Sequence, residues 1–256
     1  MREEARLETE LICGRNAVIE LLKTDRAVDT VYISSEDGEK LSYIAAMARE
    51  KKIVVKNVPA SKLTKMCGRE RHQGVAAWAA PTEYVDIDEI LGIARSRNED
   101  PFVIIADGIE DPHNLGAIIR TAECAGAHGL VFPKRGGSSI TSAVQRASAG
   151  AANRLPLARV PNIAAAVRHL KDEGVFVYCA DMDGDYCADV DMTGPLALVV
   201  GSEGEGVSRL VKQLCDVTIS LPLKGEIQSL NASVAAGAII YEIVRQRINS
   251  SRSKSK

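Results

Sequence analysis

Short apolar segments in the first third of the chain alternate between helical and strand spacing. Apolar positions recur with the period of a helix between residues 14 and 23. β-branched runs at 30–34 and 53–58 predict strands, and the stretch between them, residues 40–50, predicts a helix. The apolar run at 74–80 predicts one more buried strand. This part of the sequence therefore predicts a small α/β unit.

From Pro101 onward, apolar runs and helical patterns follow one another regularly. Four runs without alternation are typical of parallel strands buried on both faces, and they cover residues 102–106, 130–132, 175–180 and 196–200. Helices are expected between them, over residues 115–125, 141–151 and 163–173. A further strand at 217–221 precedes a long Ala-rich helix at 229–247. The order predicts an α/β fold with a doubly wound parallel sheet, whose ligands bind at the carboxyl ends of the strands.

These patterns divide the chain of 256 residues into two expected domains. Residues 11–80 form the small α/β domain, and the polar stretch 81–100 is a linker that leads into the second domain. The parallel-sheet domain covers residues 101–248. The Ser- and Lys-rich segment 249–256 is expected to be a disordered basic tail.

The formal net charge of −2 argues against a strongly nucleic-acid-binding surface, because phosphate contacts need Lys and Arg. The distribution changes this picture, since residues 11–80 hold twelve basic and eight acidic residues. Residues 245–256 add five basic residues and no acid. Basic surface is therefore compatible with the composition, although ordinary solvated faces explain the same charges equally well.

The cysteines and histidines indicate neither disulfides nor a metal site. The six cysteines contain no CxxC pair, which suits reduced thiols, and the four histidines lie far apart in the sequence. No apolar run reaches the ~20 residues that span a bilayer, and the acidic residues 1–10 do not resemble a signal peptide. We therefore expect a cytoplasmic protein without metal or membrane.

The first candidate site follows the strand at 102–106, where a polar loop precedes a predicted helix. Asn114 stands where the helix begins, so it is expected as the N-cap. Arg120 lies within the apolar part of the same helix, between Ile119 and Ala122. An arginine there must snorkel, pair with an acid or face a ligand, and the first two are the commoner outcomes.

The second candidate site is the glycine-rich sequence that follows the strand at 196–200. Its spacing, from Gly201 to Gly206, is GxxGxG and contains Glu203 and Glu205. These carboxylates would repel a pyrophosphate, so the loop suits a ligand with little or positive charge, such as a sulfonium. A tight turn between strand and helix explains the glycines equally well.

The third candidate site is the long loop that precedes the last helix. Ser229 or Asn231 is expected to cap this helix. The preceding segment, with Lys224 and Gly225, is longer than a cap requires. Three such loops at the carboxyl end of one sheet favour a shared pocket over three independent turns.

Together, these motifs resemble the SpoU (TrmH) family of RNA ribose 2′-O-methyltransferases in the SPOUT superfamily. The matching stretches are DPHNLGAIIRTAECAG, LALVVGSEGEGV and ISLPLKGEIQSLNASVA, in the same order and spacing. The stretches ICGRNAVIELL and RHQGVAA resemble the small L30e-like RNA-binding domain that many members carry. The resemblance covers nearly the whole chain, and the likeness is greatest to 23S rRNA guanosine-2′-O-methyltransferases.

The resemblance implies a site, a cofactor and an assembly. By position, the catalytic set would be Asn114, Arg120, Glu203, Ser229 and Asn231. S-adenosylmethionine (AdoMet) would lie against the backbone of Gly201, Leu221 and Leu230. The resemblance also implies a C-terminal trefoil knot, a homodimer, and structured RNA, rRNA above all, as the substrate.

The small domain is expected to bind this RNA by its shape and backbone. The candidate contacts are polar residues near its two matching stretches: Arg15, Asn16, Arg69, Arg71, His72 and Gln73. Each of them could equally belong to a solvated edge, with Gln73 serving a turn.

Three alternatives stay open at the level of the sequence. A nicotinamide oxidoreductase would explain the alternating strands and helices, but the chain has no GxGxxG after a strand. A non-catalytic RNA-binding ribosome assembly factor is a second alternative, against which the intact catalytic set counts. Within the enzyme hypothesis, tRNA is the alternative to rRNA.

Overall fold

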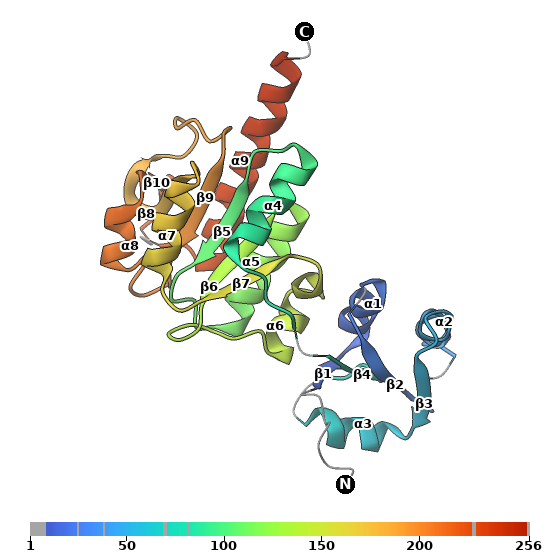
Figure 1. The fold of residues 1–256 in the computed structure, drawn as a ribbon. Helices are drawn as coiled ribbons and strands as arrows, with labels where there is room; N and C mark the ends of the chain where they lie inside the picture. The colour runs from blue at the N-terminus through green and yellow to red at the C-terminus, as the bar shows by residue number, and fades with distance from the viewer. Residues whose placement is uncertain are drawn as a thin grey trace. The chain divides into compact units, whose positions relative to one another are not determined.

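The computed structural model describes residues 9–24, 26–37, 39–68, 71–80, 82–226 and 229–254. The chain divides into two compact units (Figure 1). The first comprises Met1–Glu83 together with Ile140–Arg154, and the second comprises Tyr84–Ser139 and Leu155–Lys256. Arg69, one of the candidate RNA contacts, lies outside the described residues.

The first unit is built on a four-stranded sheet with the order β1-β4-β2-β3. Its strands are β1 (Glu10–Cys13), β2 (Val28–Ser34), β3 (Val54–Val58) and β4 (Val75–Ala79). Only β2 and β3 run parallel. Strands β2, β3 and β4 confirm the three expected strands, whereas the four-residue β1 carries too short a pattern to be predicted.

Three helices cover the two faces of this sheet. They are α1 (Arg15–Lys23), α2 (Ser42–Glu50) and α3 (Ala60–Cys67). Helices α1 and α2 bury Val18, Leu21 and Ile44 against one face. Helix α3 buries Leu63 and Cys67 against the other. Because helices bury both faces of the sheet, this small unit has a hydrophobic core of its own.

The segment 140–154 belongs to the first unit, although the sequence places it within the expected domain 101–248. It contains α6 (Ser142–Ala147) and a short 3-10 helix, η1 (Ala151–Asn153). Arg154 Nη1 lies 2.7 Å from Glu20 Oε2, and Arg26 Nη1 donates to Asn153 Oδ1 at 2.7 Å. These partners are more than a hundred positions apart in the sequence, so the local pattern could not reveal the division.

The second unit confirms the expected parallel sheet. All six strands are parallel, in the order β10-β8-β9-β5-β6-β7. They are β5 (Phe102–Ala106), β6 (Gly129–Pro133), β7 (Leu157–Val160), β8 (Phe176–Tyr186), β9 (Leu196–Val200) and β10 (Val217–Ser220). Because all strands point the same way, the loops that follow them gather at one edge of the sheet, hereafter the carboxyl edge.

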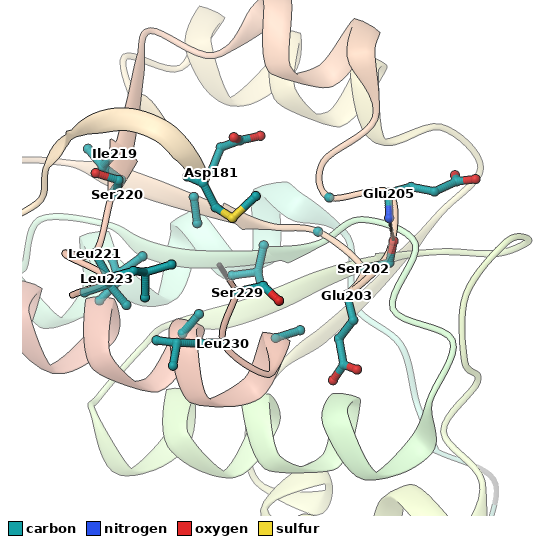
Figure 2. A pocket seen from close by; sticks show the side chains of 18 of the residues that line it. Asp181, Ser202, Glu203, Glu205, Ile219, Ser220, Leu221, Leu223, Ser229 and Leu230 are labelled. Atoms are coloured by element: carbon teal, nitrogen blue, oxygen red, sulfur yellow. Dashed lines mark hydrogen bonds between the residues drawn. The ribbon is translucent and has the colours of Figure 1, made fainter. Parts of the chain in front are cut away.

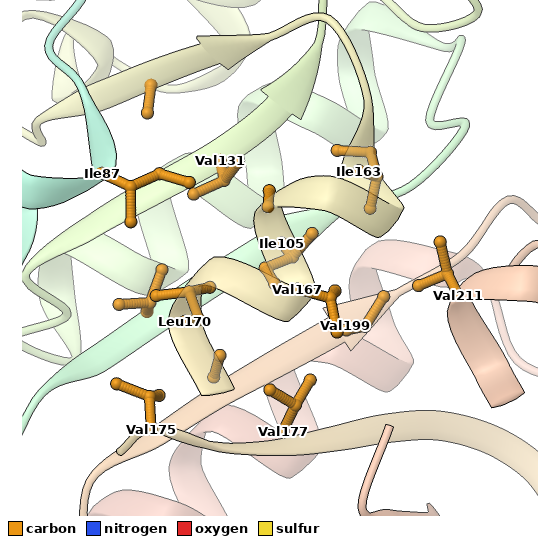
Figure 3. Packing of buried hydrophobic residues seen from close by; sticks show 14 of the residues in the cluster. Ile87, Ile105, Val131, Ile163, Val167, Leu170, Val175, Val177, Val199 and Val211 are labelled. Carbon is orange, nitrogen blue, oxygen red and sulfur yellow. The ribbon is translucent and has the colours of Figure 1, made fainter. Parts of the chain in front are cut away.

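Helices cover both faces of this sheet, as Figure 1 shows. The helices on one face are α4 (Ile87–Arg97), α7 (Ile163–Asp172) and α8 (Arg209–Leu214). Their apolar side chains pack on alternate strand residues such as Val131, Val177 and Val199 (Figure 3). On the other face, α5 (Pro112–Cys124) and α9 (Ala232–Lys254) lie side by side.

The structure adds detail at two boundaries. The stretch 81–100, expected as a linker and the entry to the second domain, contains α4, which begins with a capping box of Asp86 and Glu89 and is part of the second unit. Helix α9 extends to Lys254, into the segment expected as a basic tail. Arg247 anchors this part of the helix by donating to the carbonyls of Pro101 and Gly194.

None of the helices in the described ranges combines the length and the apolar character needed to cross a membrane.

Candidate active site

Three polar side chains from the three candidate loops meet at the carboxyl edge. Glu203 Oε1, after β9, accepts a hydrogen bond from Asn114 Nδ2 on α5 at 2.8 Å. It also accepts one from Asn231 Nδ2, at the start of α9. Asn231 Nδ2 lies 2.9 Å from Asn114 Oδ1, which closes the triangle. The structure thus brings together residues separated by up to 117 positions.

The start of α5 places Asn114 in this network. The N-cap is Asp111, whose carboxylate accepts from the backbone N–H groups of His113 and Asn114 at 3.2 Å each. A helix cap, the alternative to a functional role for Asn114, therefore does not account for this residue. Pro112 occupies the first position of the helix, where its missing N–H costs nothing. Because Asp111 caps the helix, the Asn114 side chain can donate to Glu203.

Asn231 has two functions at once. Its Oδ1 accepts from the backbone N–H of Ser233 at 3.1 Å and of Val234 at 3.2 Å, which is the geometry of a helix cap. Its amide nitrogen faces Glu203 instead. Of the two expected capping residues, Asn231 is therefore the cap, and the side chain of Ser229 remains available to a pocket.

The glycines after β9 build a tight turn. Ser202 and Gly206 exchange two backbone hydrogen bonds, at 3.1 and 3.0 Å. A Cβ on Gly201 would stand 2.0 Å from the carbonyl carbon of Gly206, which has a φ of +66°. Only glycine fits both positions. The turn projects Glu203 toward α5, and the glycines serve the turn itself.

A pocket of about 230 Å³ lies under this turn (Figure 2). Its wall includes all three expected cofactor residues, Gly201, Leu221 and Leu230, together with Glu203 and Ser229. Further leucine and isoleucine side chains make one side apolar: Leu223, Ile219 and Ile239. The pocket therefore combines an apolar wall with a carboxylate and a hydroxyl at its polar end.

Asp181 is a pocket residue that the sequence analysis missed. The ladder between β8 and β10 passes from Cys179 opposite Thr218 to Asp185 opposite Ile219, so residues 180–184 form a bulge, of which Ala180, Asp181 and Met182 line the pocket. The signal was the acidic sequence ADMDGD, which begins at the last residue of an expected strand.

Lys212 of α8 holds this new carboxylate in place, with its Nζ 2.8 Å from Asp181 Oδ2. Burial by itself would raise the pKa of Asp181. The hydrogen bonds from Lys212 and the backbone of Asp183 outweigh burial and keep the pKa below its ordinary value. Asp181 therefore stays ionised at the pocket wall.

Arg120 is exposed on α5, and no described residue pairs with its guanidinium. It does not line the pocket, and neither do Asn114 and Asn231. Of the outcomes considered for an arginine at this position, pairing with an acid is therefore absent among the described residues, whereas an exposed guanidinium fits both snorkelling and contact with a ligand. Its charge remains available to a ligand that approaches from solvent.

In the first unit, five of the candidate RNA contacts lie together at the start of α1 and in the neighbouring loop. The Arg15 backbone N–H and Nε donate to Gln73 Oε1 and to its carbonyl, at 3.1 and 3.0 Å. His72 Nδ1 accepts from the backbone N–H of Gly74 at 3.0 Å. Arg15, His72 and Gln73 therefore hold the loop, whereas Asn16 and Arg71 are exposed.

The fold and the site define an α/β enzyme with a loop-built pocket, and comparisons with known proteins identify its family. Residues 101–241 match the SpoU rRNA Methylase family. Residues 11–85 match a family described as RNA 2′-O ribose methyltransferase substrate binding. The chain belongs to the SpoU family of RNA methyltransferases.

Similar proteins cover almost the whole chain. YacO of Bacillus subtilis, which is named as a TrmH family tRNA/rRNA methyltransferase, is 42% identical over 93% of this chain and 96% of its own length. A protein of Staphylococcus haemolyticus named for the same family is 42% identical over 94% of this chain and 97% of its own length.

A solved structure agrees with this family. The SpoU methyltransferase AviRb of Streptomyces viridochromogenes has a TM-score of 0.80 at 28% identity, covering 94% of this chain and 91% of its own. AviRb has also been crystallised with AdoMet, and that structure has a TM-score of 0.79 and covers 93% of this chain and 90% of its own.

Proposed function

We propose that this chain transfers the methyl group of AdoMet to the ribose 2′-hydroxyl of a guanosine in 23S rRNA. The observation that carries the proposal is the position of the Asn114–Glu203–Asn231 network at the mouth of the pocket. Glu203 belongs to both, so a ligand in the pocket and a nucleotide at the network would be neighbours. The family descriptions, with a methylase and a substrate-binding part, support RNA as the acceptor.

The pocket fits AdoMet in chemistry. Its apolar wall suits an adenine ring, and Gly201, Leu221 and Leu230 would hold the cofactor through their backbone groups. AdoMet carries a positive sulfonium and an ammonium group. Among the described lining residues there are carboxylates, such as Asp181 and Glu203, and neither Lys nor Arg. The AdoMet complex of AviRb supports the same cofactor here.

The mechanism assigns positioning and charge stabilisation to the protein. AdoMet, when bound, supplies an electrophilic methyl group for an in-line displacement, which depends mainly on orientation. Arg120 is not a general base, because a guanidinium has a pKa above ~12. It donates instead to an RNA phosphate and to the 2′-oxygen, and so stabilises the negative charge that develops there while the hydroxyl proton passes to solvent water.

The other members of the proposed catalytic set orient the nucleotide and preserve the pocket. Asn114 and Ser229 orient the ribose, and Asn231 keeps Glu203 in place while it caps α9. In the first unit, the exposed side chains of Asn16, at the start of α1, and Arg71, in the neighbouring loop, contact the folded RNA. Arg15, His72 and Gln73 hold this loop.

A labelled-methyl assay tests the proposal. The full chain is incubated with tritiated AdoMet and unmodified transcripts of 23S rRNA or of tRNA, and the RNA is digested to nucleosides. We expect label in 2′-O-methylguanosine from 23S rRNA alone. Label from tRNA alone would show that tRNA, and not 23S rRNA, is the substrate. AdoMet binding without transfer to either RNA would favour a non-catalytic assembly factor.

We also propose a homodimer formed through α9. Val234, Tyr241 and Ile248 recur every seven residues on one side of this helix, and 55%, 52% and 47% of each is exposed. A stripe of this kind is typical of a helix that packs on a second copy.

A further inference from the structure

Cations without an acidic partner are unevenly distributed in the second unit. Most of its charged side chains on helices are paired, as Lys171 is with Asp216 and Arg95 with Glu173. The side chains of eight described lysines and arginines of the unit have no hydrogen bond or ion pair: Arg97, Arg120, Lys134, Arg135, Arg168, Arg209, Lys224 and Arg252. Four of these eight, Lys134, Arg135, Arg209 and Lys224, follow the carboxyl ends of β6, β9 and β10. Half of the unpaired cations therefore follow strands that end at the edge that carries the site.

Two of these cations are adjacent, and their backbone is held on both sides. The Lys134 N–H donates to the Val160 carbonyl at 2.7 Å, and its own carbonyl accepts from Arg159 Nη2 at 3.2 Å. Gly136 follows with a φ of +73°, which favours glycine. The side chains of Lys134 and Arg135 are nevertheless exposed. A fixed backbone that presents two exposed cationic side chains suits an anion, since only the side chains have to be ordered on binding.

The same loop is joined to the loop that carries Asn114. Ser138 N–H donates to the Ile109 carbonyl at 2.7 Å, and a Cβ on Gly137 would stand 3.5 Å from that oxygen. The acids of the Asn114 loop do not neutralise Lys134 and Arg135. Asp111 is occupied in capping α5, and Glu110 makes no ion pair with any described residue. The two cations therefore lie on a loop that contacts the segment leading into α5, and they have no counter-ion among the described residues.

We propose that Lys134 and Arg135 bind backbone phosphates of the substrate RNA beside the target nucleotide. The inference rests on the proposed function and adds to it a second RNA contact, built on the methyltransferase unit itself. RNA phosphates supply the negative counter-ions that these two cationic side chains lack. AdoMet, with its net positive charge, does not supply them. The contact aligns the strand so that the target ribose faces the Asn114–Glu203–Asn231 network.

The test is a double variant, Lys134→Ala with Arg135→Ala, in the full chain. Filter binding with a 23S rRNA transcript is measured over a range of salt concentrations, and methyl transfer is measured on the same RNA. We expect affinity to fall about tenfold at ~0.1 M salt, and the slope of log affinity against log salt to flatten by about 1.4, for two phosphate contacts. The KM for RNA rises accordingly, while kcat at saturating RNA and AdoMet affinity by calorimetry stay unchanged.

The matched control is Arg97→Ala with Arg168→Ala, which removes two unpaired charges on α4 and α7. A salt slope of the test variant equal to that of this control would overturn the inference. A loss of AdoMet affinity would also overturn it, because the loop would then support the pocket. Failure of the proposed function is distinguishable, because the wild-type chain itself would then leave the RNA unmethylated.

Discussion

At the scale of single residues, the site depends on one carboxylate oxygen that accepts from two amides. Glu203 Oε1 accepts hydrogen bonds from the side-chain amides of Asn114 and Asn231, so one acceptor joins the three loops. A charged acceptor strengthens such hydrogen bonds about twofold relative to a neutral one. The residue therefore couples the geometry of α5 to that of α9.

Replacing Glu203 by Gln removes this charge at constant size. We expect methyl transfer to fall about tenfold or more, in line with ~1.5–3 kcal/mol for a hydrogen bond to a charged group. Initial rates at saturating AdoMet measure the effect. The control is Asp172→Asn on α7, an exposed carboxylate that does not line the pocket. Equal rates for the two variants would remove Glu203 from the mechanism.

Arg120→Lys keeps the positive charge but loses the planar fork. If the guanidinium contacts a phosphate and the 2′-oxygen together, kcat falls about a hundredfold, as with other donors to a developing oxyanion. The affinity for AdoMet stays unchanged, because Arg120 does not line the pocket. Single-turnover rates and calorimetry separate the two effects. Turnover near that of the wild type would argue against a bidentate role.

At the scale of elements, apolar runs were predictable, and elements without a pattern of their own were not. Strands β5, β6, β8 and β9 follow the predicted runs because both their faces are buried. Strand β7, with four residues, has no pattern of its own and exists by pairing with β6. The bulge of β8 at residues 180–184 likewise depends on the register with β10. The trefoil knot implied by the family resemblance stays a prediction.

The glycine turn after β9 can be tested at the same scale. Gly201→Ala would place a Cβ 2.0 Å from the Gly206 backbone, so the turn must open. We expect AdoMet affinity by calorimetry to fall at least about tenfold. A loss of about 1.4 kcal/mol in binding free energy already corresponds to this factor. Gly204→Ala is the control, because no atom lies within 4 Å of its Cβ position. Similar affinities for the two variants would show that the turn does not shape the pocket.

At the scale of the whole molecule, a buried histidine couples stability to pH. His128 is 2% exposed, its Nδ1 accepts from the Phe102 N–H at 3.0 Å, and its Nε2 lies 3.0 Å from Glu99 Oε2. Burial lowers the pKa of His128 below 6.5, although Glu99 opposes the shift. The folded state therefore keeps the ring neutral at a pH where the unfolded chain takes up a proton.

The free energy of unfolding should consequently decline as pH falls below about 6.5, by at most ~1.4 kcal/mol per pH unit from this group. From about one pH unit above 6.5 the ring is neutral in both states and contributes no pH dependence. Urea unfolding from pH 7.5 to pH 5 measures the decline. A His128→Gln variant should lose this contribution and His169→Gln, at an exposed histidine, should retain it. Identical pH profiles for both would contradict the assignment.

The proposed dimer is a second property of the whole molecule. Val234→Glu with Tyr241→Glu places two charges in the exposed stripe of α9, and we expect sedimentation to report a monomer. Leu210→Glu on α8, where 51% of the side chain is exposed, is the control and should remain dimeric. A wild-type chain that sediments as a monomer would contradict the proposal.

By itself, the sequence determined the alternation of strands and helices, the parallel sheet, the three loops that carry polar residues and, through its motifs, the family. These features depend on local periodicity and on spacing within short segments. Only the tertiary structure decided that Asp111 and not Asn114 caps α5, that Asp181 lines the pocket, that segment 140–154 belongs to the first unit and that Arg120 stays unpaired. Each of these depends on contacts between residues far apart in the chain, which local patterns do not encode.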